Sequence, residues 1–312
     1  MLHLPNKPHY STFSLPTQED RYMPHSSTLL LKSPRNVVPL MGGLLAALIA
    51  FWGITSPEYW NDEAATVSAI TRSYPDLFQM LGNVDAVHGL YYALMHPWAA
   101  LFGTSELALR TPSAIALSIS NIFLIKSAQI IAPKFRLNTQ KELIFLLIVG
   151  ITGATLPGLS WSGQEARGYA FGVLCTTIAL WNFLLFLQDG KERYIFGFLV
   201  FQTLAAGFTL YSIFLLPLYC FAALWVSKKQ GVQVILTSVL VGICILPLIY
   251  VAQSQSAQLS WLQRDIPEMY QRMYSQFFFS PTNASGVWGQ RGQRMAPWIT
   301  TVSILLCIWA LF

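Results

Sequence analysis

The sequence predicts an all-α polytopic membrane protein with about eight transmembrane helices. Of its 312 residues, 54% are hydrophobic and 11% are charged, and the mean hydropathy is +0.48. A soluble domain carries roughly 25% charged residues, so this chain has too little charge to cover a surface that faces water. Long apolar runs separated by short polar segments are the other observation behind this fold class. Together they exclude a soluble enzyme, a disordered protein and a coiled coil.

The polar segment 1–36 is rich in Pro, Ser, His and Thr, and we expect a disordered cytoplasmic tail without a cleavable signal peptide. Residues 37–312 form the predicted transmembrane domain. Its candidate spans are Val37–Thr55, Leu107–Ala132, Leu143–Ser160, Ala166–Leu187, Tyr194–Leu210, Ile213–Val226, Val232–Ala252 and Ala296–Phe312. Because the last run stops with the sequence, we expect a truncated version of a longer protein.

One apolar stretch, Gly89–Phe102, is too short to cross a bilayer and contains His96 and Pro97. We therefore predict a helix that lies on the outer face. With 57–106 outside, every lysine falls in the tail, in an inner loop or in the inner half of a span. This arrangement obeys the positive-inside rule in a plasma membrane and places the N-terminus in the cytoplasm. The net charge of +5 then reflects cytoplasmic loops and does not indicate nucleic-acid binding.

Two acidic motifs lie in the first outer region, 57–106, which is the predicted catalytic loop. Asp62 and Glu63 are adjacent acids just after the first span, a pattern that suits a general base with a second acid beside it. Asp85 and His88 are three residues apart, so they can share one helix face. The alternative for the first motif is structural: Asn61 or Asp62 caps a helix that has acids in its first turn. The alternative for the second motif is that Asp85 caps a helix whose Tyr91 and Tyr92 belong to an interfacial aromatic belt.

Two arginines open spans at the same predicted face, Arg110 and Arg167. The planar guanidinium suits a phosphate or a carboxylate, and the alternative is an arginine that reaches lipid headgroups. The second outer region, 253–295, interleaves arginines with aromatic residues, and Arg264 and Arg272 are its candidates for a lipid phosphate or for interfacial anchoring. Acids and arginines from different spans on one face favour a phosphate-bearing lipid and a hydroxyl acceptor as substrates.

The sequence shows no motif for nucleotide binding, metal-dependent proteolysis or serine hydrolysis. The chain has no P-loop, no dinucleotide-binding glycine motif, no zinc-protease motif and no serine-hydrolase motif. The cysteines lie in apolar runs without metal-ligand spacing. We expect no cofactor. Three acids, Asp62, Glu63 and Asp85, are the oxygen ligands that the chain offers to a divalent metal, but nothing in the pattern requires one.

Four segments in order resemble the GT-C membrane glycosyltransferases, in the branch of protein O-mannosyltransferases and aminoarabinose transferases (glycosyltransferase family 39). The segments read Trp-Asn-Asp-Glu-Ala at 60–64, Val-Asp-Ala-Val-His-Gly-Leu-Tyr-Tyr at 84–92, Leu-Phe-Gly-Thr-Ser-Glu-Leu-Ala-Leu-Arg-Thr-Pro-Ser-Ala at 101–114 and Gln-Glu-Ala-Arg-Gly-Tyr-Ala at 164–170. The second segment is similar to that of actinobacterial members. The family commonly has Pro-Pro-Leu-Tyr-Tyr there, so this chain departs from the family at His88 and Gly89.

The resemblance implies an enzyme that transfers a sugar, most simply mannose, from a polyprenyl-phosphate donor to a protein or glycan acceptor on the outer face, with inversion. Asp62 matches the family's catalytic acid and Glu63 its neighbour. The candidate substrate-binding residues are those that the resemblance implies or that lie in the four similar segments. They are Asp85, His88, Arg110, Glu165, Arg167 and Tyr169. Both arginines are expected near the lipid phosphate or against the acids. Two other classes stay open: a multi-span transporter or lipid flippase, and an inactive truncated relative.

Overall fold

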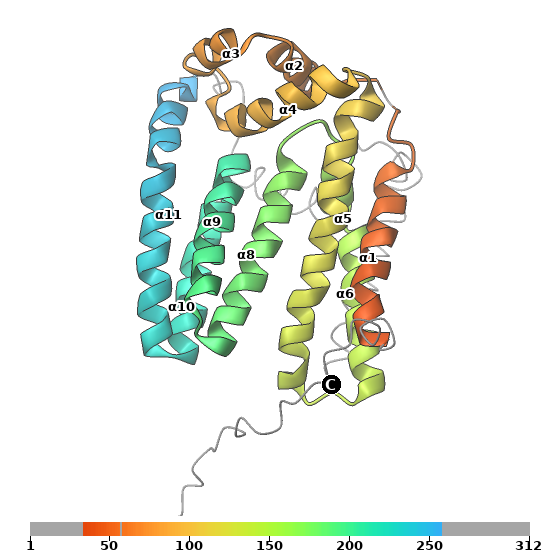
Figure 1. Cartoon of the computed structure of the whole chain (residues 1–312), viewed down its shortest axis with the longest axis vertical. Coiled ribbons are helices and arrows are strands. Elements are labelled where there is room, and N and C mark those ends of the chain that lie inside the picture. Colours follow the sequence, from red (N-terminus) through yellow and green to blue (C-terminus); the bar gives the residue numbers. More distant parts are fainter. Residues whose placement is uncertain (1–33, 57, 258–312) are drawn as a thin grey trace, which may run out of the picture.

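A computed structural model describes residues 34–56 and 58–257, and every element in these ranges is a helix (Figure 1). The elements are α1 (Pro34–Phe51), α2 (Asn61–Ile70), α3 (Tyr74–Leu81), η2 (Ala86–His88), α4 (Gly89–Phe102), α5 (Glu106–Ile131), η3 (Ala132–Phe135), α6 (Thr139–Thr155), α7 (Pro157–Ser162), α8 (Tyr169–Asp189), α9 (Glu192–Phe208), η4 (Leu210–Leu215), α10 (Leu216–Val226) and α11 (Lys228–Ser254). The predicted all-α class is confirmed for these residues. The predicted tail up to residue 33, the span Ala296–Phe312 and the outer region from 258 onward lie outside them.

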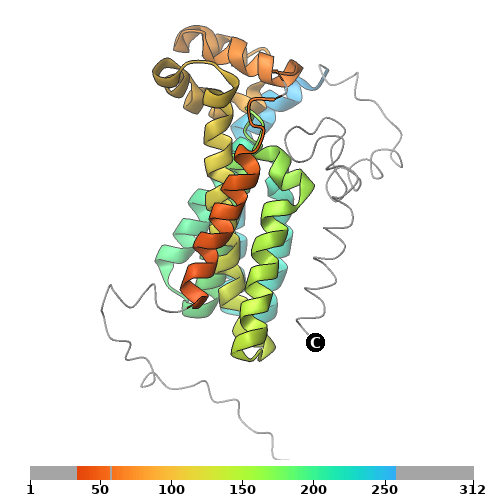
Figure 2. The same cartoon turned by 90° about the vertical axis from the view of Figure 1, so that its right-hand side faces the viewer.

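The long helices form a bundle, and α2, α3 and α4 lie across one end of it (Figures 1 and 2). We call these three helices the cap layer. Within the bundle, α1 packs against α5 and α6, α8 packs against α5 and α9, and α11 packs against α9 and α10. Helix α4 has the bounds of the stretch that the sequence set apart from the spans. The predicted loop 57–106 is thus largely helical.

Three helices of the described residues are long and apolar enough to cross a membrane: Glu106–Phe135, Tyr169–Asp189 and Lys228–Ser254. The apolar helices Arg35–Phe51 and Leu210–Val226 are shorter. Helices α6 and α9 have 17 residues each. At 1.5 Å per residue such a helix is about 26 Å long, less than the ~30 Å of a bilayer core. The fold therefore supports membrane association, whereas the predicted number of eight spans is not confirmed.

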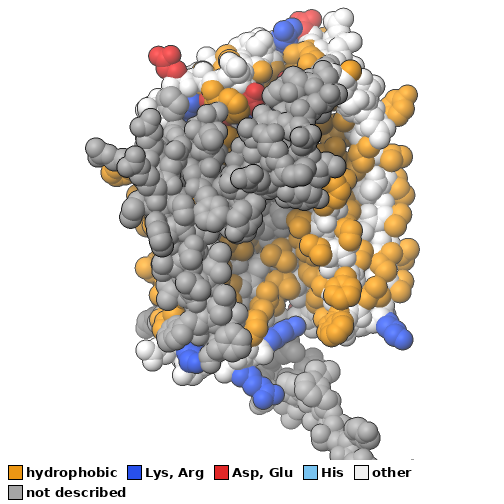
Figure 3. Space-filling model, turned by 180° about the vertical axis from the view of Figure 1, so that it is seen from behind, with side chains coloured by type: hydrophobic (Ala, Val, Ile, Leu, Met, Phe, Trp, Pro, Cys, Tyr) orange, Lys and Arg blue, Asp and Glu red, His pale blue; other side chains and the backbone are white. Residues whose placement is uncertain are grey.

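Large hydrophobic side chains on α1, α10 and α11 are exposed. The part of the bundle's side that is coloured in Figure 3 is mostly hydrophobic. Such a continuous apolar surface needs a nonpolar surrounding. Lysines and arginines gather at the end of the bundle away from the cap layer, which we call the basic end (Figure 3). Its lysines are Lys134, Lys141, Lys191, Lys228 and Lys229. These lysines lie in the chain segments 133–142, 188–193 and 227–231, which the positive-inside rule makes the predicted inner loops, and the three segments share one end of the bundle.

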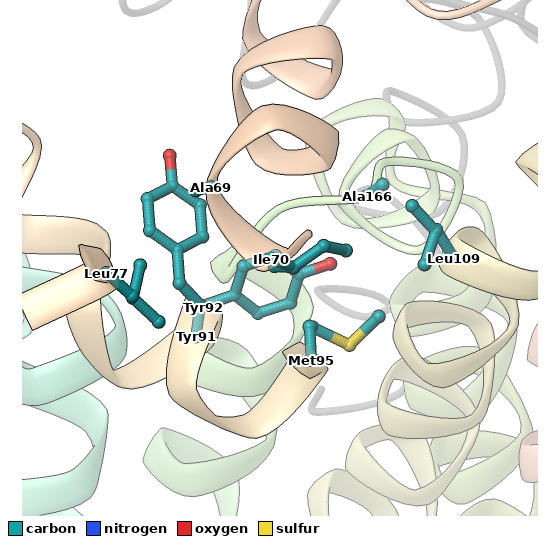
Figure 4. Close-up of a cluster of buried hydrophobic side chains, with 8 residues drawn as sticks. All are labelled: Ala69, Ile70, Leu77, Tyr91, Tyr92, Met95, Leu109 and Ala166. Atoms are coloured by element: carbon teal, nitrogen blue, oxygen red, sulfur yellow. The ribbon is translucent and has the colours of Figure 1, made fainter. Parts of the chain in front are cut away.

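An apolar cluster attaches the cap layer to the bundle (Figure 4). Tyr91, Tyr92 and Met95 of α4 are almost completely buried, and they pack with residues of α2, α3, α5 and the turn before α8. The other members of the cluster are Ala69, Ile70, Leu77, Leu109 and Ala166. Fully burying a large apolar side chain contributes about 1.5–3 kcal/mol. This packing holds the polar ends of α2 and α4 in a defined place.

One buried amide joins three helices in the middle of the bundle. Asn121 of α5 donates from Nδ2 to the carbonyl oxygens of Gly42 in α1 (2.8 Å) and Gly150 in α6 (3.0 Å). Two glycines make this approach feasible, since a Cβ on Gly42 would lie 2.2 Å from Ile125 Cδ1.

Asn121→Ala is therefore expected to lower the free energy of unfolding by about 1 kcal/mol, the scale of interhelical hydrogen bonds in membrane proteins. Thermal unfolding of the detergent-solubilised protein measures this change. Ser127→Ala is the matched control, because the Ser127 hydroxyl donates only within its own helix, to Phe123 O. Equal losses in the two variants would contradict an interhelical role for Asn121.

Candidate functional site

Glu63 and Arg110 form a buried ion pair at the junction of the cap layer and the bundle. Arg110 donates from Nε to Glu63 Oε1 (2.8 Å) and from Nη2 to Glu63 Oε2 (2.5 Å), and Glu63 is 0% and Arg110 2% exposed. The remaining polar atoms are also engaged: Glu63 Oε1 accepts from the N–H of Ala166, and Arg110 Nη1 donates to Ile54 O. This bidentate pair ties the first turn of α2 to α5 and to the turn before α8.

The turn 163–168 carries the second arginine. The predicted span began at Ala166, but α8 begins at Tyr169, so Arg167 lies in the turn and not in the helix. Gln164 anchors this turn, because its Nε2 donates to Trp52 O (2.9 Å) and to two further carbonyl oxygens at the end of α1. The carbonyls of the last helical turn lack the N–H donors that continue a helix, so the amide of Gln164 supplies a donor to this end of α1.

Arg167 connects both acidic motifs. Its Nη1 donates to Asp62 O (3.2 Å) and to the hydroxyl of Tyr92 (2.9 Å), and its Nη2 donates to His88 Nε2 (2.8 Å). The Tyr92 hydroxyl in turn donates to Asp85 Oδ2 (3.1 Å). The carboxylate of Asp62 lies 3.9 Å from Arg167 Nη2, and its side chain is 43% exposed. Asp62 is thus held from its backbone while its carboxylate stays accessible.

The protonation states of this network follow from its contacts. An arginine only donates hydrogen bonds, so His88 Nε2 must carry a lone pair that faces Arg167. Burial, followed by the charge of Arg167, lowers the pKa of His88 to about 4, against the opposing charge of Asp85. Burial raises the pKa of Tyr92 above its usual value, so its hydroxyl keeps the proton that it donates to Asp85.

One distant segment, the end of α11, holds the backbone next to Asp85. Asp85 has φ 58° and ψ 25°, a left-handed conformation that Asp tolerates better than most residues. Next to it, the N–H of Ala86 donates to Gln255 Oε1 (3.0 Å), and Gln255 Nε2 donates to Leu81 O (2.9 Å). The end of α11 thereby holds the start of η2, where Asp85 meets Tyr92 and His88 meets Arg167.

Glu165 is buried beside the ion pair, and it accepts a hydrogen bond from Trp60 Nε1 (2.5 Å). Burial and then the negative charge of Glu63 raise the pKa of Glu165 to about 8, although the bond from Trp60 opposes the shift. At pH 7 the carboxyl therefore carries a proton. The last predicted residue, Tyr169, stacks on Trp161 with ring centroids 5.4 Å apart.

Glu165 should make the stability of the protein depend on pH. The folded state keeps a proton that the unfolded chain releases above the ordinary pKa of 4.5, so the stability from this group is complete below 4.5 and lost as the pH rises to about 8. Between pH 5 and pH 8, the unfolding temperature of the wild type is expected to fall more steeply than that of Glu165→Gln. Glu58→Gln, which removes an exposed acid at the same end, should keep the wild-type slope. Equal slopes for Glu165→Gln and the wild type would exclude this titration.

The structure thus brings together Asp62, Glu63, Asp85, His88, Arg110, Glu165, Arg167 and Tyr169 at one end of the bundle. The N-cap of α2 is Trp60 and not Asn61 or Asp62, although Asp62 and Glu63 do lie in its first turn. Asp85 is the N-cap residue of η2, but its side chain makes no capping hydrogen bond. Arg264 and Arg272 lie outside the described residues. Sequence reasoning gave no role to Trp60, Gln164 or Gln255, of which the first two lie in the motifs, and it considered Tyr92 only as part of an interfacial aromatic belt.

Within the described residues, no group of three or more His, Cys, Asp or Glu side chains is arranged to hold a metal ion. Of the acids that the sequence offers as ligands, Glu63 is occupied by Arg110 on both oxygens. Cys175, Cys220 and Cys244 are free thiols.

Fold and site together define a helical protein that has helices able to cross a membrane and a cluster of ionisable groups at one end of its bundle. Comparison of the chain with known protein families, with characterised proteins and with solved structures found no match in any of the three.

Proposed function

We propose that this protein is an integral membrane glycosyltransferase of the GT-C type. In this proposal it transfers a sugar from a polyprenyl-phosphate donor to a hydroxyl of a protein or glycan on the outer face of the plasma membrane. The sugar that the resemblance to the GT-C family suggests is mannose. The observation that carries the proposal is the accessible carboxylate of Asp62 beside the buried guanidinium of Arg167. Of the two adjacent acids, only Asp62 has a carboxylate that is not saturated by protein donors.

The proposed reaction is a single displacement. The acceptor oxygen forms a bond to the anomeric carbon while the bond from that carbon to the phosphate oxygen breaks, so the configuration inverts. Asp62 takes the proton of the acceptor hydroxyl, and the electron pair of the broken bond leaves with the polyprenyl phosphate. The developing phosphate charge needs cations, and this role is proposed for Arg264 and Arg272.

The buried groups around Asp62 act as positioning residues. Arg167 holds the backbone of Asp62 and lies near its carboxylate. Glu63 and Arg110 fix the helix turn that bears Asp62. The expectation that the two arginines lie against the acids agrees with these contacts better than direct binding of the donor phosphate, since both guanidiniums are buried.

The test is an assay of the full chain in proteoliposomes with radiolabelled polyprenyl-phosphate mannose. A peptide rich in serine and threonine and a mannose oligosaccharide serve as acceptors. The expected result is label on one acceptor with release of an equal amount of polyprenyl phosphate. Donor that moves across the bilayer with its sugar still attached would instead indicate a flippase. Donor that binds without cleavage would indicate an inactive relative, and either result would overturn the proposal.

A further inference from the structure

A cavity of about 570 Å³ lies at the basic end, between α1, α5 and α8. It is at the opposite end of the bundle from the cap layer, so no residue of the candidate site lines it. Three cations line it: Arg35, Lys126 and Lys134. The remaining wall is largely apolar, with Trp181 and Leu184 of α8 among its residues.

Two residues of the cavity wall, Arg35 of α1 and Gln129 of α5, contact each other. Arg35 Nη2 donates to Gln129 O (2.9 Å), and Gln129 Nε2 donates back to Arg35 O (2.7 Å). Arg35 also pairs with Glu142 (3.2 Å). The charge of Arg35 is therefore already balanced, and its role is to join the helices around the cavity.

The two lysines have no such balance. Among the described residues neither Lys126 nor Lys134 forms an ion pair with an acid. Lys126 lies inside the apolar helix α5, and its ammonium sits 5.2 Å from the ring centroid of Phe123 and 5.6 Å from that of Trp181. Aromatic faces attract a cation but do not neutralise it. A charge placed inside a membrane-spanning helix normally has a partner, so this geometry calls for an anion in the cavity.

We propose that the cavity binds an anionic phospholipid, with the phosphate of its headgroup between Lys126 and Lys134 and an acyl chain along the apolar wall at Trp181 and Leu184. Basic pockets between membrane helices recognise acidic headgroups, and a tryptophan at such a depth suits the boundary between headgroup and chain. The apolar wall favours a lipid over a free phosphate ion, which would leave that wall without a partner. This site is independent of the proposed sugar transfer.

The experiment uses the full chain in nanodiscs of phosphatidylcholine that contain increasing fractions of phosphatidylglycerol with brominated acyl chains. Bromine quenches nearby tryptophan fluorescence, and subtraction of the Trp181→Phe signal isolates Trp181. The expected result is half-maximal quenching of Trp181 at a mole fraction about fivefold or more below that for brominated phosphatidylcholine, the preference that one lysine near a headgroup provides.

Two variants test the lysines. Lys126→Gln combined with Lys134→Gln should remove the preference, whereas Lys228→Gln combined with Lys229→Gln should retain it. The control pair takes the same charge from the same end of the bundle, but from exposed positions outside the cavity. Loss of the preference in both pairs would reduce the effect to general surface charge and overturn the site.

If the variant with both cavity lysines replaced does not fold, quenching measurements on the wild type alone still test the proposal. Equal quenching by brominated phosphatidylglycerol and brominated phosphatidylcholine would overturn an anionic headgroup as the ligand. Millimolar inorganic phosphate or glycerol 3-phosphate should not displace the brominated lipid. Displacement by inorganic phosphate would show a site for free anions and would overturn the lipid as occupant.

Discussion

Asp62→Asn is expected to lower the rate of sugar transfer by about 10²–10⁴-fold, the usual contribution of a general base. Asparagine keeps the shape of the side chain but cannot accept the proton of the acceptor hydroxyl. The fold should be retained, because the carboxylate is partly exposed and its distance of 3.9 Å to Arg167 gives only a weak ion pair. The measurement is the initial rate of label transfer from polyprenyl-phosphate mannose to the acceptor.

The matched control is Glu58→Gln, which removes an exposed carboxylate close to Asp62 in the chain and should keep the wild-type rate. Thermal unfolding of both variants separates loss of chemistry from loss of fold. A wild-type rate in a well-folded Asp62→Asn protein would exclude Asp62 as the base. It would leave open whether transfer occurs, which the wild-type assay decides by itself.

Arg110→Met is expected to lower the free energy of unfolding by about 3–5 kcal/mol, because it leaves the buried carboxylate of Glu63 without its cation. In the wild type, both carboxylate oxygens of Glu63 accept hydrogen bonds from Arg110, and the two side chains are buried from water. Denaturant or thermal unfolding in detergent measures the loss. Arg72→Met, which removes an exposed arginine of the same region, is expected to stay within about 0.5 kcal/mol of the wild type.

Addition of Glu63→Gln to Arg110→Met should recover part of that loss. The glutamine carries no charge that needs compensation, and its oxygen still accepts from the N–H of Ala166. A double variant as unstable as Arg110→Met alone would show that the cost comes from lost packing of the arginine. A stable Arg110→Met protein would show that Glu63 has found another partner or a proton.

Much of the fold was predictable because apolar runs must become helices in a lipid-like surrounding. Seven of the eight candidate spans overlap helices of the described residues, and the short helix α4 has the bounds that its length and proline indicated. The number of spans was less predictable. Runs such as Leu143–Ser160 contain a break, since α6 ends at Thr155 and α7 begins at Pro157. The apolar composition of a run does not indicate whether it forms one helix or two.

The convergence of acids and arginines was predictable for a related reason, because charges are rare in this chain and each one requires a partner. Their pairing was not. The first motif offers two adjacent acids, and adjacent helix residues point in different directions, so the rotation of α2 decided that Glu63 is buried and Asp62 is accessible. Gln255 had no signal in the sequence at all, since its partners Leu81 and Ala86 are more than 160 positions away.

The sequence by itself determined the helical class, the apolar surface and the set of polar groups that have to be accounted for, because these depend on composition and on local periodicity. Only the tertiary structure decided which carboxylate is neutralised, which carries a proton and which faces outward. Those properties depend on the distance between charges and on their burial, and both arise where segments such as 60–64 and 164–170, about 100 positions apart, meet at one end of the bundle.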